Sequence, residues 1–299
     1  MKTLEMIKPI LPVLMLLVFN NPSFSQKLDP KERIIEPDHI ITSEITKRNY
    51  QLFISFPNSY STKDTISYPV LYVLDGERNF DFFYRPNIFL SAMGKIEQTI
   101  IVGIDSGKDR KAQIVNRTYH FTPTIDKDSS NVRQREKSLG LAEGTLLSGA
   151  AADFLKVIKT EIAPFIDENY KTNADRGISG HSLGGLFTAY CLVNSDGYFT
   201  RFGINSPSLW WNEEEFLNQA VQQFEDIEDW EIPPTKVFIS SGGDEGIYIL
   251  PTTIKFYTHL KNANYKNIEL NWQIFDNENH VTVRPLSLRQ TIIELYGKE

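Results

Sequence analysis

The stretch Gly180-His181-Ser182-Leu183-Gly184 has the pattern Gly-x-Ser-x-Gly and lies between a short apolar segment and a helical pattern. We expect a strand that ends near Ser179 and a helix from Leu183 to about Val193, joined by a sharp turn at Ser182. Such a turn holds a serine in a strained backbone conformation and projects its oxygen at the carboxyl end of a sheet. The two glycines are expected to prevent side-chain collisions at this turn. The pattern thus predicts a nucleophilic serine at the edge of an α/β sheet.

Strands and helices alternate on both sides of this turn, which favours an open α/β sheet, mostly parallel, with helices on both faces. Short apolar runs such as residues 69–74 and 99–104 are typical of strands buried on both faces. An antiparallel strand pair is expected over residues 39–56. Further strands are expected near residues 202–204, 236–241 and 268–275. Further helices are expected over residues 150–170, 252–260 and 286–296.

Composition and charge exclude several classes of protein. The 299 residues carry 31 Lys and Arg and 38 Asp and Glu, a net charge of −7, which argues against a nucleic-acid-binding protein. Hydrophobic residues make up 41% of the chain and charged residues 23%, which excludes a disordered chain and a multi-span membrane protein. The single cysteine, Cys191, can form neither an internal disulfide nor a cysteine-rich metal site.

The first 25 residues have the three parts of a secretory signal peptide. Lys2 and Lys8 precede the apolar run of residues 10–19, and small polar residues follow it before Gln26. That run is too short to span a bilayer, which needs about 20 apolar residues. An uncleaved N-terminal anchor is the alternative. We therefore expect a secreted or periplasmic protein with a single domain over residues 26–299 and no membrane span after signal cleavage.

A serine hydroxyl is a weak nucleophile near neutral pH and needs an adjacent base. In folds that use this turn, the order along the chain is serine, acid, histidine. His280 follows the expected strand 268–275 and precedes the last helix, so it should open at the same sheet end as Ser182. We expect His280 to be the base. The other histidines precede the serine, adjoin it or fall within an expected helix; they are His39, His120, His181 and His259.

The acid is expected directly after the strand 236–241, in the loop Gly242-Gly243-Asp244-Glu245-Gly246. It would accept a hydrogen bond from the imidazole and fix the tautomer of the ring. Glu245 is favoured over Asp244 for this role. Asp276 is a third candidate, but it is too close in sequence to His280 to approach the ring easily from the opposite side.

Several further motifs accompany the turn. They are Leu74-Asp75-Gly76, Asn116-Arg117 with Phe121-Thr122-Pro123, Gly180–Gly185, Ser206–Trp211 and Asn279-His280. Together they resemble a bacterial esterase family that contains enterochelin-type siderophore esterases, feruloyl and acetylxylan esterases, and mycolyltransferases. The resemblance covers most of residues 35–298.

This resemblance implies an α/β-hydrolase fold and a Ser-acid-His hydrolase without a cofactor or a metal. It also implies that the acid is the fourth residue of a Gly-x-x-acid stretch, here Glu245. The chain departs from the family at His120, where members often carry an acidic residue, so any family role of that position is in question.

The oxyanion hole is expected to use two backbone N–H groups. One is that of Leu183, directly after the nucleophile. The other should follow the strand 69–74, and the resemblance to mycolyltransferases implies the amide of Glu77. The side chains implied to contact the substrate are those of Asp75, Arg78, Arg117, Trp210 and Trp211. The tryptophan pair resembles a wall of the family's acyl pocket; an ordinary aromatic rim is the alternative.

The segment from Asp105 to Thr145 is expected to be a long polar insertion between a strand and the next helix. Its 41 residues far exceed the usual βα loops of about 2–6 residues, and long loops at this sheet end often carry function. It holds eight Lys and Arg against six Asp and Glu, a net charge of +2 in an acidic chain. A basic lid would favour an anionic substrate. A solvated loop of mixed charge is the alternative.

These observations predict a serine carboxylic-ester hydrolase that acts through an acyl-enzyme on a small-molecule ester. The basic segment slightly favours siderophore esters of the trilactone type. A carbohydrate-linked ester hydrolase for feruloyl or acetyl groups, and an acyltransferase on the same fold, are the alternatives. A non-catalytic binding module is disfavoured because Ser182 and His280 are both present.

Overall fold

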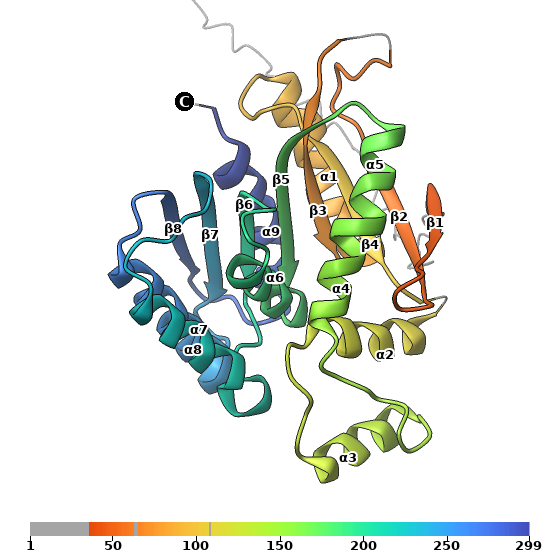
Figure 1. Ribbon diagram of the computed structural model, residues 1–299, viewed down its shortest axis with the longest axis vertical. Coiled ribbons are helices and arrows are strands. Elements are labelled where there is room, and N and C mark those ends of the chain that lie inside the picture. The colour runs from red at the N-terminus through yellow and green to blue at the C-terminus, as the bar shows by residue number, and fades with distance from the viewer. Residues whose placement is uncertain (1–35, 63–64, 108, 299) are drawn as a thin grey trace, which may run out of the picture. The chain divides into compact units, whose positions relative to one another are not determined.

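Among the described residues, eight strands form one sheet in the order β1-β2-β4-β3-β5-β6-β7-β8 (Figure 1). The computed structural model describes residues 36–62, 65–107 and 109–298, so the predicted signal peptide lies outside the described residues. β1 (His39–Thr42) and β2 (Asn49–Ser55) are the predicted antiparallel pair, and β2 also runs antiparallel to β4 (Ile100–Asp105). All later pairs in this order are parallel, which confirms the mostly parallel sheet.

The parallel strands follow the apolar runs of the sequence. β3 (Tyr68–Leu74) and β4 are buried along their whole length, because helices cover both faces of the sheet. The sheet continues with β5 (Thr172–His181), β6 (Arg201–Asn205), β7 (Thr235–Gly242) and β8 (Ile268–Phe275). The carboxyl ends of these strands lie at one edge, which is where ligands bind in such folds.

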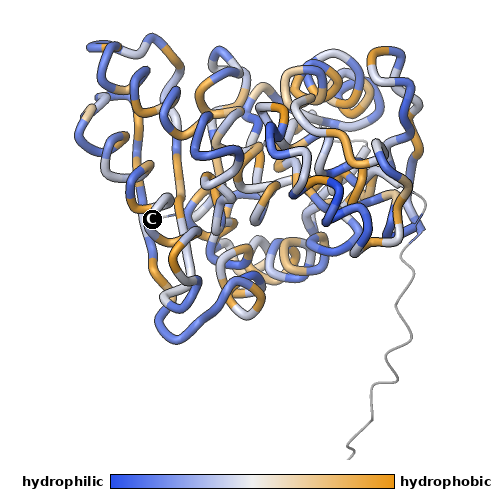
Figure 2. The backbone as a smooth tube through the Cα atoms, turned by 90° about the horizontal axis from the view of Figure 1, so that it is seen from below, coloured by the Kyte–Doolittle hydropathy of each residue, from blue (hydrophilic) through white to orange (hydrophobic). Residues whose placement is uncertain are grey.

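Helices form a layer on each face of the sheet (Figure 1). α1 (Gly76–Ala92) and α9 (Val283–Tyr296) pack together on one face. The other face carries α4 (Ala151–Val157), the π-helical turn η1 (Ile158–Ile162), α5 (Ala163–Asn169), α6 (Leu183–Asn194) and α8 (Gly246–Ala263), with α7 (Trp211–Asp226) against α8. Hydrophilic stretches are concentrated in the loops and helices at the periphery (Figure 2). Every helix of the described residues is too short or too polar to cross a bilayer.

The segment 105–145 is not the continuous polar loop that the sequence analysis expected. It contains α2 (Arg110–Phe121) and α3 (Ser129–Leu139). Asp109 and Asp128 cap these helices by accepting backbone N–H groups of their first turns. α3 buries only Glu136, so its sequence lacks the apolar periodicity by which a helix is recognised.

Other helix boundaries also differ from the prediction. α1 begins at Gly76, shortly after β3, where no helix was predicted. Its Asp75 N-cap forms no side-chain cap bond and Pro86 lies inside the helix, so the usual start and continuity signals are missing. α7 was not predicted at all, and α8 begins six residues before the expected residue 252.

His120, where this chain departs from the family pattern, is a core residue. Its ring is fully buried, stacks on Phe154 and lies 3.1 Å from the Tyr50 hydroxyl through Nε2. Burial, followed by the charge of Arg48, lowers the pKa of His120 to about 3, so the ring is neutral at physiological pH. This position packs the core and does not face Ser182.

Candidate active site

Ser182 lies in the sharp turn between β5 and α6, as the motif predicts. Its backbone has φ 64° and ψ −120°, a conformation that strains a residue with a side chain. Two main-chain hydrogen bonds hold the turn. The N–H of Ser182 donates to the carbonyl of Asn205 at 3.1 Å, and the N–H of Ser208 donates to the carbonyl of Ser182 at 3.0 Å. The last residue of β6 and the segment that follows it therefore hold the nucleophile candidate in place.

Close packing explains one of the two motif glycines. A Cβ atom at Gly180 would lie 2.5 Å from the carbonyl group of Gly184, so no side chain fits there. A Cβ at Gly184 would have Cβ of Leu74 as its nearest neighbour, at an ordinary contact distance of 3.5 Å, so the expected collision at that glycine is wrong. Gly185 is the crowded position instead, because a Cβ there would lie 2.6 Å from the carbonyl oxygen of Asn205.

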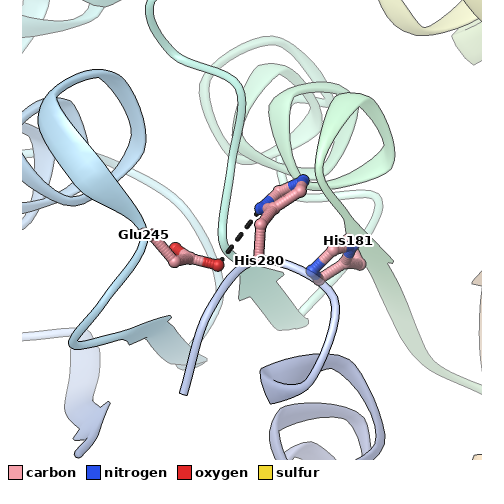
Figure 3. A group of neighbouring side chains, drawn as sticks. All are labelled: His181, Glu245 and His280. Atoms are coloured by element: carbon pink, nitrogen blue, oxygen red, sulfur yellow. Dashed lines mark hydrogen bonds and ion pairs between the residues drawn. The ribbon is translucent and has the colours of Figure 1, made fainter. Parts of the chain in front are cut away.

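Ser182, His280 and Glu245 form a continuous chain of hydrogen bonds. His280 Nε2 lies 3.0 Å from Ser182 Oγ, and His280 Nδ1 lies 3.1 Å from Glu245 Oε1. Figure 3 shows the Glu245 carboxylate facing the His280 ring. An ionised carboxylate only accepts, so Nδ1 carries the ring proton and Nε2 can accept the serine hydroxyl. The geometry is that of a nucleophile, a base and an orienting acid.

The Glu245 side chain is fully buried, and its second oxygen accepts a hydrogen bond from the hydroxyl of Ser241. Ser241 was not among the predicted site residues, although it lies near the end of β7, the strand that precedes the acid. The two other candidate acids, Asp244 and Asp276, are exposed. The backbone N–H of Asp244 donates to the carbonyl of Glu278 at 3.0 Å. Of the three acids considered, the structure brings Glu245 to the histidine.

The hydroxyl of Ser182 and the ring of His280 open into a pocket of about 390 Å³. Four guanidinium groups line this pocket, those of Arg78, Arg110, Arg117 and Arg284. Arg117 forms a two-pronged ion pair with Asp75, at 2.8 and 2.9 Å. Among the residues that the structure describes, the other three arginines form no ion pair, so the pocket carries uncompensated positive charge.

Arg284 illustrates this excess of charge. Burial and then the neighbouring charge of Arg78 lower the pKa of Arg284, and its Nε is buried without a hydrogen-bond partner. A buried donor without a partner is costly, and an anionic ligand would satisfy it. Arg78 and Arg117 were predicted as substrate contacts, and Arg110 was one of the basic residues counted in the segment 105–145; Arg284 belongs to none of the motifs and was not predicted.

Other basic residues counted in the segment 105–145 lie on α3, away from Ser182. Arg135 packs over the ring of Trp211, 5.7 Å from its centroid, and Arg133 lines a separate pocket between α3 and residues 143–148. Neither lines the pocket of Ser182. The segment 105–145 still supplies positive charge to that pocket, but through Arg110 and Arg117 of α2.

The two tryptophans differ in their surroundings. Trp211 is buried, and its indole N–H donates to the carbonyl of Thr124 at 3.1 Å. Trp210 is 39% exposed, and its ring lies 6.3 Å from that of Tyr248. Trp210 is therefore the more exposed member of the pair. Both rings line a pocket formed with residues of 126–135 and 212–213, and neither lines the pocket of Ser182.

A family model described as "Putative esterase" matches residues 43–246, which is more than half of the chain and includes Ser182 and Glu245. The chain belongs to this esterase family. The resemblance inferred from the sequence motifs is thereby confirmed, and the protein is an esterase by family.

Relatives and solved structures agree with this assignment. The esterase is 23% identical to the apo-salmochelin esterase of Escherichia coli CFT073, over 84% of this chain and 76% of that protein. It is 24% identical to the ferri-bacillibactin esterase BesA of Bacillus subtilis, over 85% of this chain and 86% of that protein. The structure of the BES protein from Bacillus cereus matches with a TM-score of 0.72 at 24% identity, covering 86% of this chain and 93% of that one. The predicted α/β-hydrolase fold is confirmed.

The two expected oxyanion donors of the esterase differ in whether their backbone N–H already donates a hydrogen bond. Leu183 is the first residue of α6, where a backbone N–H has no acceptor within the helix. The N–H of Glu77 instead donates to Asp105 Oδ2 at 3.2 Å. The role of Glu77 as a donor therefore stays a prediction, and it requires Asp105 to release this amide.

Asp105 is a buried carboxyl group that the sequence analysis did not single out. It ends β4 and also accepts a hydrogen bond from the N–H of Ser106 at 2.7 Å. Burial, followed by the negative charge of Asp75, raises the pKa of Asp105 to about 7. An acid at the end of a fully apolar strand was the available signal, but its partner on α1 is visible only in three dimensions.

Glu245→Gln should lower kcat of the esterase by about 10²–10⁴, because an amide orients the imidazole poorly and does not stabilise the imidazolium. Asp244→Asn is the matched control, since this neighbouring acid is exposed, and it should change kcat less than about threefold. Steady-state hydrolysis of a p-nitrophenyl ester measures both. Equal, mild effects would place the acid elsewhere.

Asp105→Asn should make the stability of the esterase less dependent on pH. The folded pKa of about 7 lies above the ordinary value of 3.8, so the folded carboxyl keeps a proton that the unfolded one has lost. Its contribution to stability is therefore complete below pH 3.8 and is lost as the pH rises through 7, by roughly 2–4 kcal/mol.

The measurement is Tm of the wild type and of Asp105→Asn between about pH 5 and about pH 8. The wild type should lose Tm relative to the variant as the pH rises, and all other titrations cancel in this difference. Parallel Tm curves would show that Asp105 titrates normally.

Proposed function

We propose that this esterase is a serine carboxylic-ester hydrolase that acts through an acyl-enzyme. The observation that carries the proposal is the hydrogen-bonded chain from Ser182 through His280 to Glu245, with distances of 3.0 and 3.1 Å. The strained turn at the N-terminus of α6 adds to this support, because it presents the hydroxyl beside a free backbone amide.

In the proposed reaction, Ser182 Oγ attacks the ester carbonyl carbon while His280 Nε2 takes the hydroxyl proton. Glu245 stabilises the imidazolium through Nδ1. The oxyanion is bound by the N–H of Leu183 and, once Asp105 releases it, by that of Glu77. His280 then protonates the leaving alcohol. Water, activated by the same histidine, cleaves the acyl-enzyme and restores the serine.

We further propose that the substrate is an anionic siderophore ester. The pocket beside Ser182 supports an anion because three of its four arginines are without an ion pair among the described residues. The names of two relatives, a salmochelin esterase and a bacillibactin esterase, point to the same class of ester. Export by the signal peptide predicted for residues 1–25 would place this activity in a secreted or periplasmic compartment.

Ser182→Ala should lower kcat by at least about 10⁴ while Tm changes by no more than a few degrees, because the hydroxyl forms the covalent intermediate. Ser208→Ala is the matched control. Its hydroxyl lies 3.3 Å from Ser182 Oγ but outside the proposed chain, so it should cost less than about tenfold. Hydrolysis of p-nitrophenyl butyrate and labelling by a fluorophosphonate measure both. A Ser182→Ala protein that keeps more than a few per cent of kcat would disprove the mechanism.

Arg284→Gln should raise KM for an anionic ester by about tenfold, because a charge-assisted hydrogen bond is worth about 1.5–3 kcal/mol. KM for a neutral ester of similar size should stay within about twofold. The hemisuccinate and butyrate esters of p-nitrophenol form such a pair. Salt should weaken the difference for the wild type.

Arg133→Gln is the control for this test, since Arg133 lines a different pocket. It should leave the ratio of the two KM values unchanged. Equal KM changes for both esters in Arg284→Gln would refute the anionic pocket but not the serine mechanism. Comparing bacillibactin with a feruloyl ester then separates the siderophore substrate from the carbohydrate-linked alternative.

A further inference from the structure

Three side chains from separate parts of the fold converge next to Ser182. His181 ends β5, Glu245 precedes α8, and His280 lies between β8 and α9 (Figure 3). Each offers one nitrogen or oxygen ligand atom, and these atoms all lie within 4.8 Å of one another. His181 is only 7% exposed and the Glu245 side chain is fully buried, whereas His280 is partly open to solvent.

Two imidazoles and one carboxylate form a ligand set that is typical of Zn²⁺. With bonds of about 2.0–2.1 Å, the ligand atoms of a tetrahedral site lie about 3.4 Å apart, so these side chains need to move inward by about 1.5 Å at most. A second observation also points to a ligand. Nε2 of His181 is buried without a hydrogen-bond partner, and the proposed mechanism does not use this ring.

We propose that His181, Glu245 and His280 form an inhibitory binding site for a single Zn²⁺ ion. The ion would bind Nδ1 of His280 in place of the hydrogen bond to Glu245, and the ring proton would move by exchange with solvent from Nδ1 to Nε2. With Nε2 protonated, His280 could not accept the proton of Ser182. Metal binding itself does not depend on the proposed function; only its inhibitory consequence rests on it.

The surroundings set the expected strength of this site. Glu245 compensates part of the metal charge, whereas Arg284 and Arg117 contribute a positive field that already acts on His181. A hard cation such as Mg²⁺ prefers oxygen ligands and should not bind to a site with two imidazoles. We therefore expect a Zn²⁺ dissociation constant on the order of micromolar, weaker than that of structural zinc sites.

The first test is inhibition of ester hydrolysis by ZnCl₂ in chelator-treated protein. The wild type should lose activity at micromolar Zn²⁺, recover it with EDTA, and show no response to Mg²⁺. His181→Gln removes one ligand outside the proposed catalytic chain and should raise the inhibition constant at least tenfold. Equal inhibition of this variant and the wild type would overturn the proposal.

The second test does not depend on turnover. Calorimetric titration of the Ser182→Ala protein with ZnCl₂ should show one binding site, because all three ligands remain. Adding His181→Gln to this protein should weaken binding at least tenfold. Absence of binding to Ser182→Ala would overturn the metal site, whereas loss of activity in Ser182→Ala bears only on the serine mechanism. The two proposals can therefore fail separately.

Discussion

The positive φ angle of Ser182 is the constraint on which the site depends. Such a conformation costs about 1–3 kcal/mol and persists only where the surroundings hold it. The buried side chain of Asn205 is central to this support. Its amide donates to the carbonyl groups of Gly180 and Gly203, and its oxygen accepts from Ser240 on β7 and Thr291 on α9. One residue thus contacts the elements that flank the serine, the acid and the histidine in the chain.

Carboxylates and guanidiniums are packed closely beside this turn, and their arrangement decides which backbone amides are free. Arg117 compensates the charge of Asp75 through an ion pair. Within the described part of the chain, Asp105 has no such partner, and burial disfavours its charged form. Asp105 offsets part of this cost by accepting a hydrogen bond from the N–H of Glu77 in the first turn of α1. The same amide is the expected oxyanion donor. The N–H of Glu77 can therefore either stabilise the start of α1 through Asp105 or bind the oxyanion, but not both at once.

The strands and the chain Ser182-His280-Glu245 could be predicted from the sequence because each leaves a local signal. Buried parallel strands are continuous apolar runs, and the three polar residues follow strand ends in a fixed order. α3 could not be predicted, because it is solvated on almost all sides. Ser241 and Asp105 were missed for a different reason. Asp105 contacts Glu77, which the fold brings close from 28 positions away, and Ser241 contacts Glu245 only because the loop between them turns the acid back toward β7.

Three arginines of the pocket share a position that becomes visible only when the helix starts are known. Arg78, Arg110 and Arg284 each lie in the first turn of a helix, those of α1, α2 and α9. A cation in this position opposes the helix macrodipole and costs each helix some stability. All three of these arginines line the same pocket, although the net charge of the chain is −7. The positive helix ends and the guanidiniums add to the same local field, so an anion bound there would relieve repulsion within the protein as well as gain its own contacts.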